Sequence, residues 1–272
     1  MLDATLPPPA PAPLGTVPLG ATPLGPVPGA AGLPAFRAQD YAAYGAEAHA
    51  VWGLLYARRM AALAETGSRV FLRGAERIGL RPDRVPELAD VNRRLGALTG
   101  WAAVGVDGFL PADQFFRCLA ARRFPTTLGV RPRARLDYLP EPDIFHDVFG
   151  HVPLHADPAF ARFLRHFGRV AARARAPEHT EAMARLFWFT VEFGLVREGG
   201  RVKVYGSGLI SSHGDAANAL GPSCERRPFV LADVVAQPFA TDRMQDVLFV
   251  VEDFGQLRAA VDALGRALGL LA

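Results

Sequence analysis

The residues best suited to chemistry lie in the stretch 142–153 (PDIFHDVFGHVP), which contains two histidines, His146 and His151. In an α-helix each residue turns by about 100°, so positions five apart point about 140° away from each other. Gly150 suits the left-handed residue that ends a helix, and Pro153 stops the helix from continuing. We therefore predict that His146 lies on a last helical turn and that His151, on the departing chain, swings back to form a two-ligand metal site.

A third ligand is predicted in the stretch 185–195 (RLFWFTVEFGL), a nearly unbroken apolar and aromatic run with one carboxylate, Glu192. A buried carboxylate is costly unless a cation or hydrogen bonds compensate for it. Two histidines and one carboxylate form the facial triad that is typical of non-haem Fe(II) oxygenases and leaves coordination positions open. Each stretch taken alone also fits a core helix, with structural histidines or a capped glutamate.

Three ordered segments, EPDIFHDVFGHVPL, FWFTVEFGLV and YGSGLISSHGD, resemble the signature of the pterin-dependent aromatic amino acid hydroxylases, most closely the short bacterial type that acts on phenylalanine. The resemblance extends from about Gln39 to about Asp253. It implies Fe(II) held by His146, His151 and Glu192, a tetrahydropterin co-substrate, and hydroxylation of L-phenylalanine to L-tyrosine with O₂. It also implies a mainly α (α+β) fold, with a single helix-rich catalytic domain and a few short strands.

The resemblance further implies a set of substrate-binding residues: Arg131, Asp143, Pro142, Trp188, Gly208 and Ser211. Arg131 would take the carboxylate of the amino acid bidentately, a task that suits its planar guanidinium, and Asp143 would hold Arg131 in place. Pro142 and Trp188 would line the pocket for the aromatic ring. Gly208 and Ser211 would contact the amino acid moiety, although a Ser/Gly stretch is by itself an ordinary turn.

The pterin is expected at the loop from Trp101 to Phe116, which is punctuated by glycines and ends in a helix near Pro111. By resemblance, the pterin ring would stack on Phe115, and backbone from Gly108 to Leu110 would contact its polar edge. Residue type alone favours Phe115 as a core aromatic. Asp147, beside the first histidine, matches an acid near the pterin and is expected to accept a hydrogen bond there.

The elements that position these residues are read from apolar spacing and from helix-breaking residues. Short strands or extended loops are expected between Arg122 and Pro140. A strand is expected over Val202–Tyr205, followed by a turn at Gly206–Gly208. After Phe239 the chain is expected to be helical through Gln256 to Leu271. The other predicted helices are Ala43–Ala64, a helix after Ser68 closed by Gly79, Arg84–Leu98, Pro158–Arg173 and Glu178–Arg197.

Composition places the chain among small globular proteins. We expect a Pro/Ala/Gly-rich disordered tail over residues 1–35 and a catalytic domain over 36–272. A net charge of +3 without basic–aromatic clusters argues against nucleic-acid binding, and no apolar run is long enough for a membrane span. Two widely spaced cysteines and the absence of sustained heptads favour a cytoplasmic monomer.

Other functions fit parts of the pattern. Tryptophan or tyrosine could replace phenylalanine as the substrate of the same chemistry. His146, His151 and His155 together could form the three-histidine site of a zinc hydrolase, but Glu192 would then be unexplained. His155 is instead predicted to be a surface or loop residue. A third alternative is a non-catalytic metal-binding or pterin-recycling protein. Such a protein would not need the intact metal ligands together with the substrate-binding residues Arg131 and Trp188.

Overall fold

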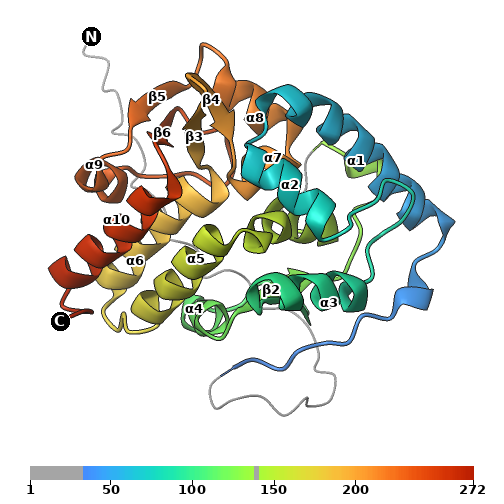
Figure 1. The fold of residues 1–272 in the computed structure, drawn as a ribbon, viewed down its shortest axis with the longest axis horizontal. Helices are drawn as coiled ribbons and strands as arrows, with labels where there is room; N and C mark the ends of the chain where they lie inside the picture. Colours follow the sequence, from blue (N-terminus) through green and yellow to red (C-terminus); the bar gives the residue numbers. More distant parts are fainter. Residues whose placement is uncertain (1–32, 138–140) are drawn as a thin grey trace, which may run out of the picture.

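The computed structural model describes residues 33–137 and 141–272, and it is rich in helices with a few short strands, as predicted (Figure 1). Residues 1–32, most of the predicted tail, lie outside the described part of the chain. The α-helices are α1 (Ala46–Thr66), α2 (Arg69–Arg77), α3 (Leu88–Thr99), α4 (Ala112–Ala120), α5 (Pro158–Ala171), α6 (Pro177–Phe187), α7 (Ser207–Ser211), α8 (His213–Leu220), α9 (Leu231–Ala236) and α10 (Phe254–Ala267). Shorter helical segments are η1 (Tyr41–Ala43), η2 (Arg133–Arg135), η3 (Phe145–His151), η4 (Val152–Ala156) and η5 (Trp188–Glu192).

Local sequence signals set several helix ends. The hydroxyl oxygen of Ser68 accepts a hydrogen bond from the backbone N–H of Phe71 at 3.2 Å, which caps the start of α2 as expected for a serine. Gly79 follows this helix with a φ of +75°, a conformation that glycine adopts without steric cost. Helix α3 begins at Leu88, later than the predicted Arg84.

The strands form two small sheets. Strand β1 (Ala102–Val106) pairs in parallel with β2 (Arg123–Thr127), and α4 makes the crossover between them. The second sheet has the order β4-β3-β6-β5, in which β3 (Leu195–Glu198) is antiparallel to β4 (Arg201–Val204). Strand β6 (Val247–Val251) is parallel to both β3 and β5 (Glu225–Pro228). Gly199 and Gly200 join β3 to β4, with positive φ at both residues, as a tight hairpin requires.

Three segments differ from the prediction. The expected loop after Trp101 begins with β1, which pairs with β2 over its full length. The expected turn at Gly206–Gly208 is instead the start of α7. The segment Val247–Val251 was included in a helical stretch but forms β6, because its run of β-branched and aromatic residues suits a buried parallel strand.

The core holds η3, which carries both predicted histidine ligands, against α1. Trp52 of α1 packs edge-to-face on Phe145 and Phe149 of η3, with ring centroids 5.3 and 6.4 Å apart. Phe145 and Phe149 stack on each other at 4.5 Å. All three rings are fully buried. These aromatic contacts fix one side of η3 in the core and so determine where its histidines can point.

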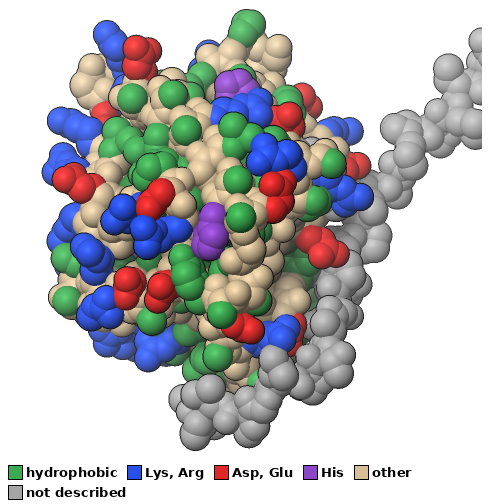
Figure 2. Space-filling model, turned by 90° about the vertical axis from the view of Figure 1, so that its right-hand side faces the viewer, with side chains coloured by type: hydrophobic (Ala, Val, Ile, Leu, Met, Phe, Trp, Pro, Cys, Tyr) green, Lys and Arg blue, Asp and Glu red, His purple; other side chains and the backbone are tan. Residues whose placement is uncertain are grey.

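Basic and acidic side chains lie interspersed with apolar ones over the face that Figure 2 shows. Many arginines pair with acids at the surface, for example Arg81 and Arg84 with Asp83, and Arg133 with Glu47. Among the described helices, none combines the length and the apolar character that crossing a membrane requires.

Candidate metal centre

His146 and His151 both lie in η3, which is π-helical. A π-helix has i→i+5 hydrogen bonds, so residues five apart lie nearly above one another. The predicted helix end at Gly150 is therefore wrong, because the chain stays helical through His151 and passes directly into η4. The two imidazole rings nevertheless meet as predicted, with centroids 5.0 Å apart and perpendicular planes.

Glu192 ends a second π-helical segment, η5, which continues α6. The helix predicted to reach Arg197 therefore stops at Glu192, and β3 begins at Leu195. Gly194 permits this sharp reversal, because a Cβ atom there would collide with the carbonyl of Thr190 and the phenol of Tyr205. Each half of the centre is thus carried by a π-helical turn.

The three predicted ligands meet at one point. The Nε2 atom of His151 lies 3.0 Å from Oε1 of Glu192, and Nε2 of His146 lies 3.7 Å from Oε2. One ligand atom from each of the three residues lies within 4.8 Å of the others. Two imidazole nitrogens and one carboxylate oxygen are the donor set of a non-haem Fe(II) centre, so the residues fit the implied metal.

The carboxylate of Glu192 is held in its charged form. Burial alone would raise its pKa, but attraction to His151 and His146 and hydrogen bonds from His151 and Ser207 lower the pKa to about 2. Glu192 is therefore ionised at neutral pH, as a metal-binding carboxylate must be.

Two serines of α7 hold the ligands from behind. Ser207 donates a hydrogen bond from its hydroxyl to Oε2 of Glu192 at 2.7 Å. The hydroxyl of Ser211 lies 2.9 Å from Nδ1 of His146 and donates its hydrogen to the carbonyl of Ser207 at 2.8 Å. Since a hydroxyl has only one hydrogen, Ser211 accepts from Nδ1–H of His146, which leaves the lone pair of Nε2 for a metal. The contact of Ser207 with Glu192 was not predicted; its only sequence signal was a Ser/Gly stretch read as a turn.

Asp147 follows the first histidine in η3 and is buried, and its carboxylate accepts hydrogen bonds from Thr127 rather than from a proposed ligand. Its Oδ2 atom accepts hydrogen bonds from the backbone N–H of Thr127 at 2.7 Å and from the Thr127 hydroxyl at 2.6 Å. Asp147 thus ties η3 to the end of β2. Burial raises the pKa of its carboxyl group.

Arg131 and Asp143 form a buried pair on the predicted substrate side. Nε and one terminal nitrogen of Arg131 donate to the two oxygens of Asp143 at 2.9 and 2.8 Å, and the other terminal nitrogen donates to the carbonyl of Leu136 at 3.1 Å. A guanidinium has five N–H donors, so one donor remains on each terminal nitrogen. This arrangement suits a second, bidentate carboxylate.

A cavity of about 440 Å³ brings a predicted pterin residue, Gly108, together with a predicted substrate residue, Pro142. Its wall also contains Thr127, the partner of Asp147. Leu110 is partly buried in the loop between β1 and α4 and is not among the residues that line this cavity. Phe115, in α4, is also outside the lining and packs edge-to-face on Phe187 at 5.3 Å.

Trp188 lies within an aromatic stack. Its ring lies 4.5 Å from that of Phe239, nearly parallel to it, and 4.8 Å from that of Phe193. Phe239 follows a proline in a segment with no regular spacing, so nothing in the sequence linked it to Trp188. Gly208 is buried, and a Cβ atom at this position would lie 3.0 Å from the Phe193 ring.

His155 is not the surface or loop residue that the sequence predicted. It is fully buried (0 % exposed) in η4, and its Nδ1 atom donates to the carbonyl of His151 at 2.9 Å. Its ring packs on Trp101 at 4.6 Å and on Phe124 at 5.0 Å. Burial lowers its pKa to about 3, so the ring is neutral. His155 is outside the ligand cluster, which does not support the three-histidine zinc site.

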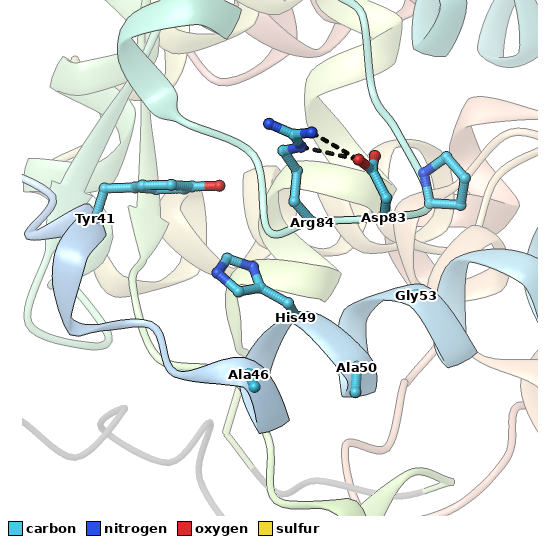
Figure 3. Close-up of a pocket in the computed structure, with 8 residues that line it drawn as sticks. Tyr41, Ala46, His49, Ala50, Gly53, Asp83 and Arg84 are labelled. Atoms are coloured by element: carbon cyan, nitrogen blue, oxygen red, sulfur yellow. Dashed lines mark hydrogen bonds and ion pairs between the residues drawn. The ribbon is translucent and has the colours of Figure 1, made fainter.

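A larger surface pocket, of about 680 Å³, contains none of these residues (Figure 3). It lies between α1 and the turn at Pro82–Arg84, and Figure 3 shows the carboxylate of Asp83 bonded to Arg84. His49 Nδ1 accepts from the backbone N–H of Val85 at 3.1 Å. Because these polar groups are already paired, size alone does not make this pocket the functional site.

Comparison with known proteins agrees with this geometry. The family model of the biopterin-dependent aromatic amino acid hydroxylases matches residues 38–268. The phenylalanine-4-hydroxylase of Chromobacterium violaceum is 41 % identical over 79 % of this chain and 72 % of the relative. That of Mesorhizobium japonicum is 41 % identical over 82 % and 81 %. The crystal structure of the C. violaceum enzyme with iron(III) and 7,8-dihydrobiopterin aligns with a TM-score of 0.82 at 40 % identity, over 86 % of each chain. This chain therefore belongs to the biopterin-dependent aromatic amino acid hydroxylase family.

Proposed function

We propose that this chain is a phenylalanine 4-monooxygenase, which uses iron, a tetrahydropterin and O₂ to convert L-phenylalanine into L-tyrosine. The observation that carries the proposal is the cluster of His146, His151 and Glu192 in a chain that is about 40 % identical to several bacterial phenylalanine-4-hydroxylases. Bound iron and pterin supply the O₂ activation and the two electrons that reduce the second oxygen atom to water.

The metal would be held by His146, His151 and Glu192. The Nδ1–H of His146 is directed to Ser211, and the ionised Glu192 is fixed by Ser207, so the donors point inward before a metal arrives. Three protein ligands leave coordination positions open for the reacting molecules. The chain thus supplies a preorganised, negatively charged donor set.

The substrate would be held by its carboxylate on Arg131, which Asp143 orients. Its aromatic ring would lie against Trp188 and Pro142, and Gly208 and Ser211 would lie beside its amino acid moiety. Because Ser211 also contacts His146, the amino acid end of the substrate would lie close to the metal ligands. These contacts orient the ring and exclude water from the reacting atoms.

The pterin would be held on the other side by Gly108, Leu110, Phe115 and Asp147. The cavity lined by Gly108 and Pro142 supports this placement, since it joins the loop after β1 to the substrate side. Asp147 is tied to Thr127, which also lines that cavity, so its carboxylate is fixed next to the space. Phe115 would provide an aromatic face for the pterin ring.

We also propose that the protein acts as a cytoplasmic monomer. The two cysteines, Cys118 and Cys224, are free and buried, which is typical of proteins in reducing compartments. No sustained heptad pattern, of the kind that joins subunits through a coiled coil, is present in the sequence. Light scattering on the purified chain tests the oligomeric state.

The direct test is tyrosine formation from phenylalanine by the purified chain with Fe(II), a tetrahydropterin and O₂. The matched variant is Glu192→Gln, which keeps the size of the side chain and removes the ligand charge. Tyrosine formed by the wild type and lost in the variant supports the proposal. If the pterin is oxidised with tryptophan but no tyrosine forms from phenylalanine, the chain is a hydroxylase of the same kind with tryptophan as its substrate. No pterin oxidation with any aromatic amino acid, despite bound iron, would refute the hydroxylase function.

A further inference from the structure

Arg59, on α1, is a buried cation without an acidic partner. Its exposed fraction is 2 %, and among the residues that the structure describes no carboxylate pairs with it. Its neighbour Arg58 has a side chain that is 40 % exposed and forms an ion pair with Asp137. Burial lowers the pKa of Arg59 to about 10, which reflects the cost of placing its charge there. A buried charge normally requires compensating contacts.

Both hydrogen bonds of Arg59 go to one short helix. Its Nε atom donates to the carbonyl of Ile210 at 2.7 Å, and a terminal nitrogen donates to the carbonyl of Leu209 at 3.0 Å. Both carbonyls belong to the last turn of α7, which packs against α1. The C-terminal carbonyls of a helix lack partners within the helix and carry partial negative charge, so they suit a forked cation.

Helix α7 needs such an anchor because it has only 5 residues, too few to be stable without tertiary contacts. The same helix carries the serines behind the metal ligands. Ser207, at its start, donates to Glu192, and Ser211, at its end, accepts from His146. A shift or rotation of α7 would therefore move both hydroxyls away from the atoms that they orient.

We propose that Arg59 is a positioning residue of the metal centre, which clamps α7 so that Ser207 and Ser211 hold Glu192 and His146 in their metal-binding orientation. This inference rests on the proposed metal site, but not on the identity of the substrate. Both hydrogen bonds of Arg59 go to α7 and neither goes to a ligand, so its effect on the ligands passes through the two serines. Removing partners behind metal ligands typically weakens metal affinity about 10–100-fold.

The test measures metal affinity directly, by titrating Co²⁺ into the metal-free full chain and following its visible ligand-field absorption. Arg59→Met keeps the length and packing of the side chain but removes the fork, and we expect about tenfold weaker binding or more. Arg59→Lys, with one charged donor group, should fall between Met and the wild type. Arg58→Met, one residue away, is the matched control and should bind like the wild type.

A purely stabilising role predicts a different result. Arg59→Met would then melt at a lower temperature but bind Co²⁺ as tightly as the wild type, which would overturn the inference. If the Met variant does not fold, Arg59→Gln, which can still bond one carbonyl, takes its place. Weaker Co²⁺ binding by this variant supports the inference, and unchanged binding overturns it.

The route through the serines has its own test. In a Ser207→Ala/Ser211→Ala background, Arg59→Met should have no further effect on Co²⁺ affinity, because residues that act as a unit are not additive. A further tenfold loss in that background would refute the route. If the wild-type protein binds no Co²⁺, or binds it equally well when Glu192 is replaced, the metal site itself is refuted, and with it the proposed function.

Discussion

The carboxylate of Asp143 is bonded to the segment that carries the first histidine: its Oδ1 atom accepts the backbone N–H of His146 at 3.0 Å. The same carboxylate accepts hydrogen bonds from Nε, a terminal nitrogen and the backbone N–H of Arg131. The predicted substrate clamp and the backbone of the first predicted metal ligand are therefore held by one buried acid. A hydrogen bond to a charged group contributes about 1.5–3 kcal/mol, so removing this shared acid should disturb both segments.

Arg131→Lys should weaken phenylalanine binding, because a lysine cannot bond Asp143 and a second carboxylate through one planar fork. Loss of one charge-assisted hydrogen bond predicts a fall in kcat/KM for phenylalanine of about tenfold or more. Steady-state kinetics with varied phenylalanine measure this effect, and the KM for the tetrahydropterin should change little. Phenethylamine has no carboxylate. If kcat/KM falls equally for phenylalanine and for phenethylamine, Arg131 does not bind the substrate carboxylate.

The aromatic stack of Trp188 on Phe239 predicts a role for Phe239 in shaping the ring pocket. Phe239→Ala removes a stacked ring, an interaction of about 0.5–1.5 kcal/mol, so the KM for phenylalanine should rise about 2–10-fold. The space made available should also raise the turnover of tryptophan relative to phenylalanine. Competition assays with both amino acids check the ratio, and an unchanged ratio would show that Phe239 only supports the fold.

The meeting of the three proposed ligands, and the pairing of Arg131 with Asp143, could be predicted because these residues lie in long, distinctive stretches. His146, His151 and Glu192 meet as expected, and Asp143 holds Arg131 as expected. The local geometry could not be predicted. Apolar spacing is interpreted with the α-helical period, and nothing in it marks the wider π-helical turns of η3 and η5.

Two further roles were missed because they depend on distant contacts. Ser207 and Ser211 lie in a stretch typical of turns, but this stretch folds as α7, and its packing against η3 and η5 brings both serines to the ligands. His155 is polar in a proline-containing segment, but the rings of Trp101 and Phe124, distant in sequence, bury it. Tertiary contacts of this kind override local propensity.

Acid should destabilise the fold through His155. Its pKa is about 3 in the folded chain and about 6.5 when unfolded, so below pH 6.5 the unfolded chain binds the extra proton. The free energy of unfolding should fall by about 2 kcal/mol between pH 7 and pH 5 from this group, and the loss should continue until about pH 3. Urea unfolding at several pH values measures it. His155→Phe should remove this part of the pH dependence, and an identical dependence in the variant would contradict the assignment.

The reversal after Glu192 should not tolerate a side chain at Gly194. A Cβ atom there collides with Thr190 and Tyr205, so Gly194→Ala must displace η5 and should cost about 1–3 kcal/mol of stability. Gly96→Ala, in the last turn of α3 with nothing within 4 Å of the added atom, is the matched control and should stabilise the protein by about 0.4–1 kcal/mol. Thermal unfolding distinguishes the two. Equal effects would mean that the segment after Glu192 can relax without strain.

Removing the metal should destabilise the wild type but not Glu192→Gln. A ligand that binds only the folded state adds RT ln(1 + [L]/Kd), which is about 2.7 kcal/mol at a free metal concentration of 100 Kd. Thermal unfolding with Fe(II) under anaerobic conditions, and again after chelation, should show this difference in the wild type. In Glu192→Gln, two imidazoles remain without the anionic ligand, so the shift should largely disappear. A stability shift of equal size in the variant would mean that Glu192 is not a ligand of the bound metal.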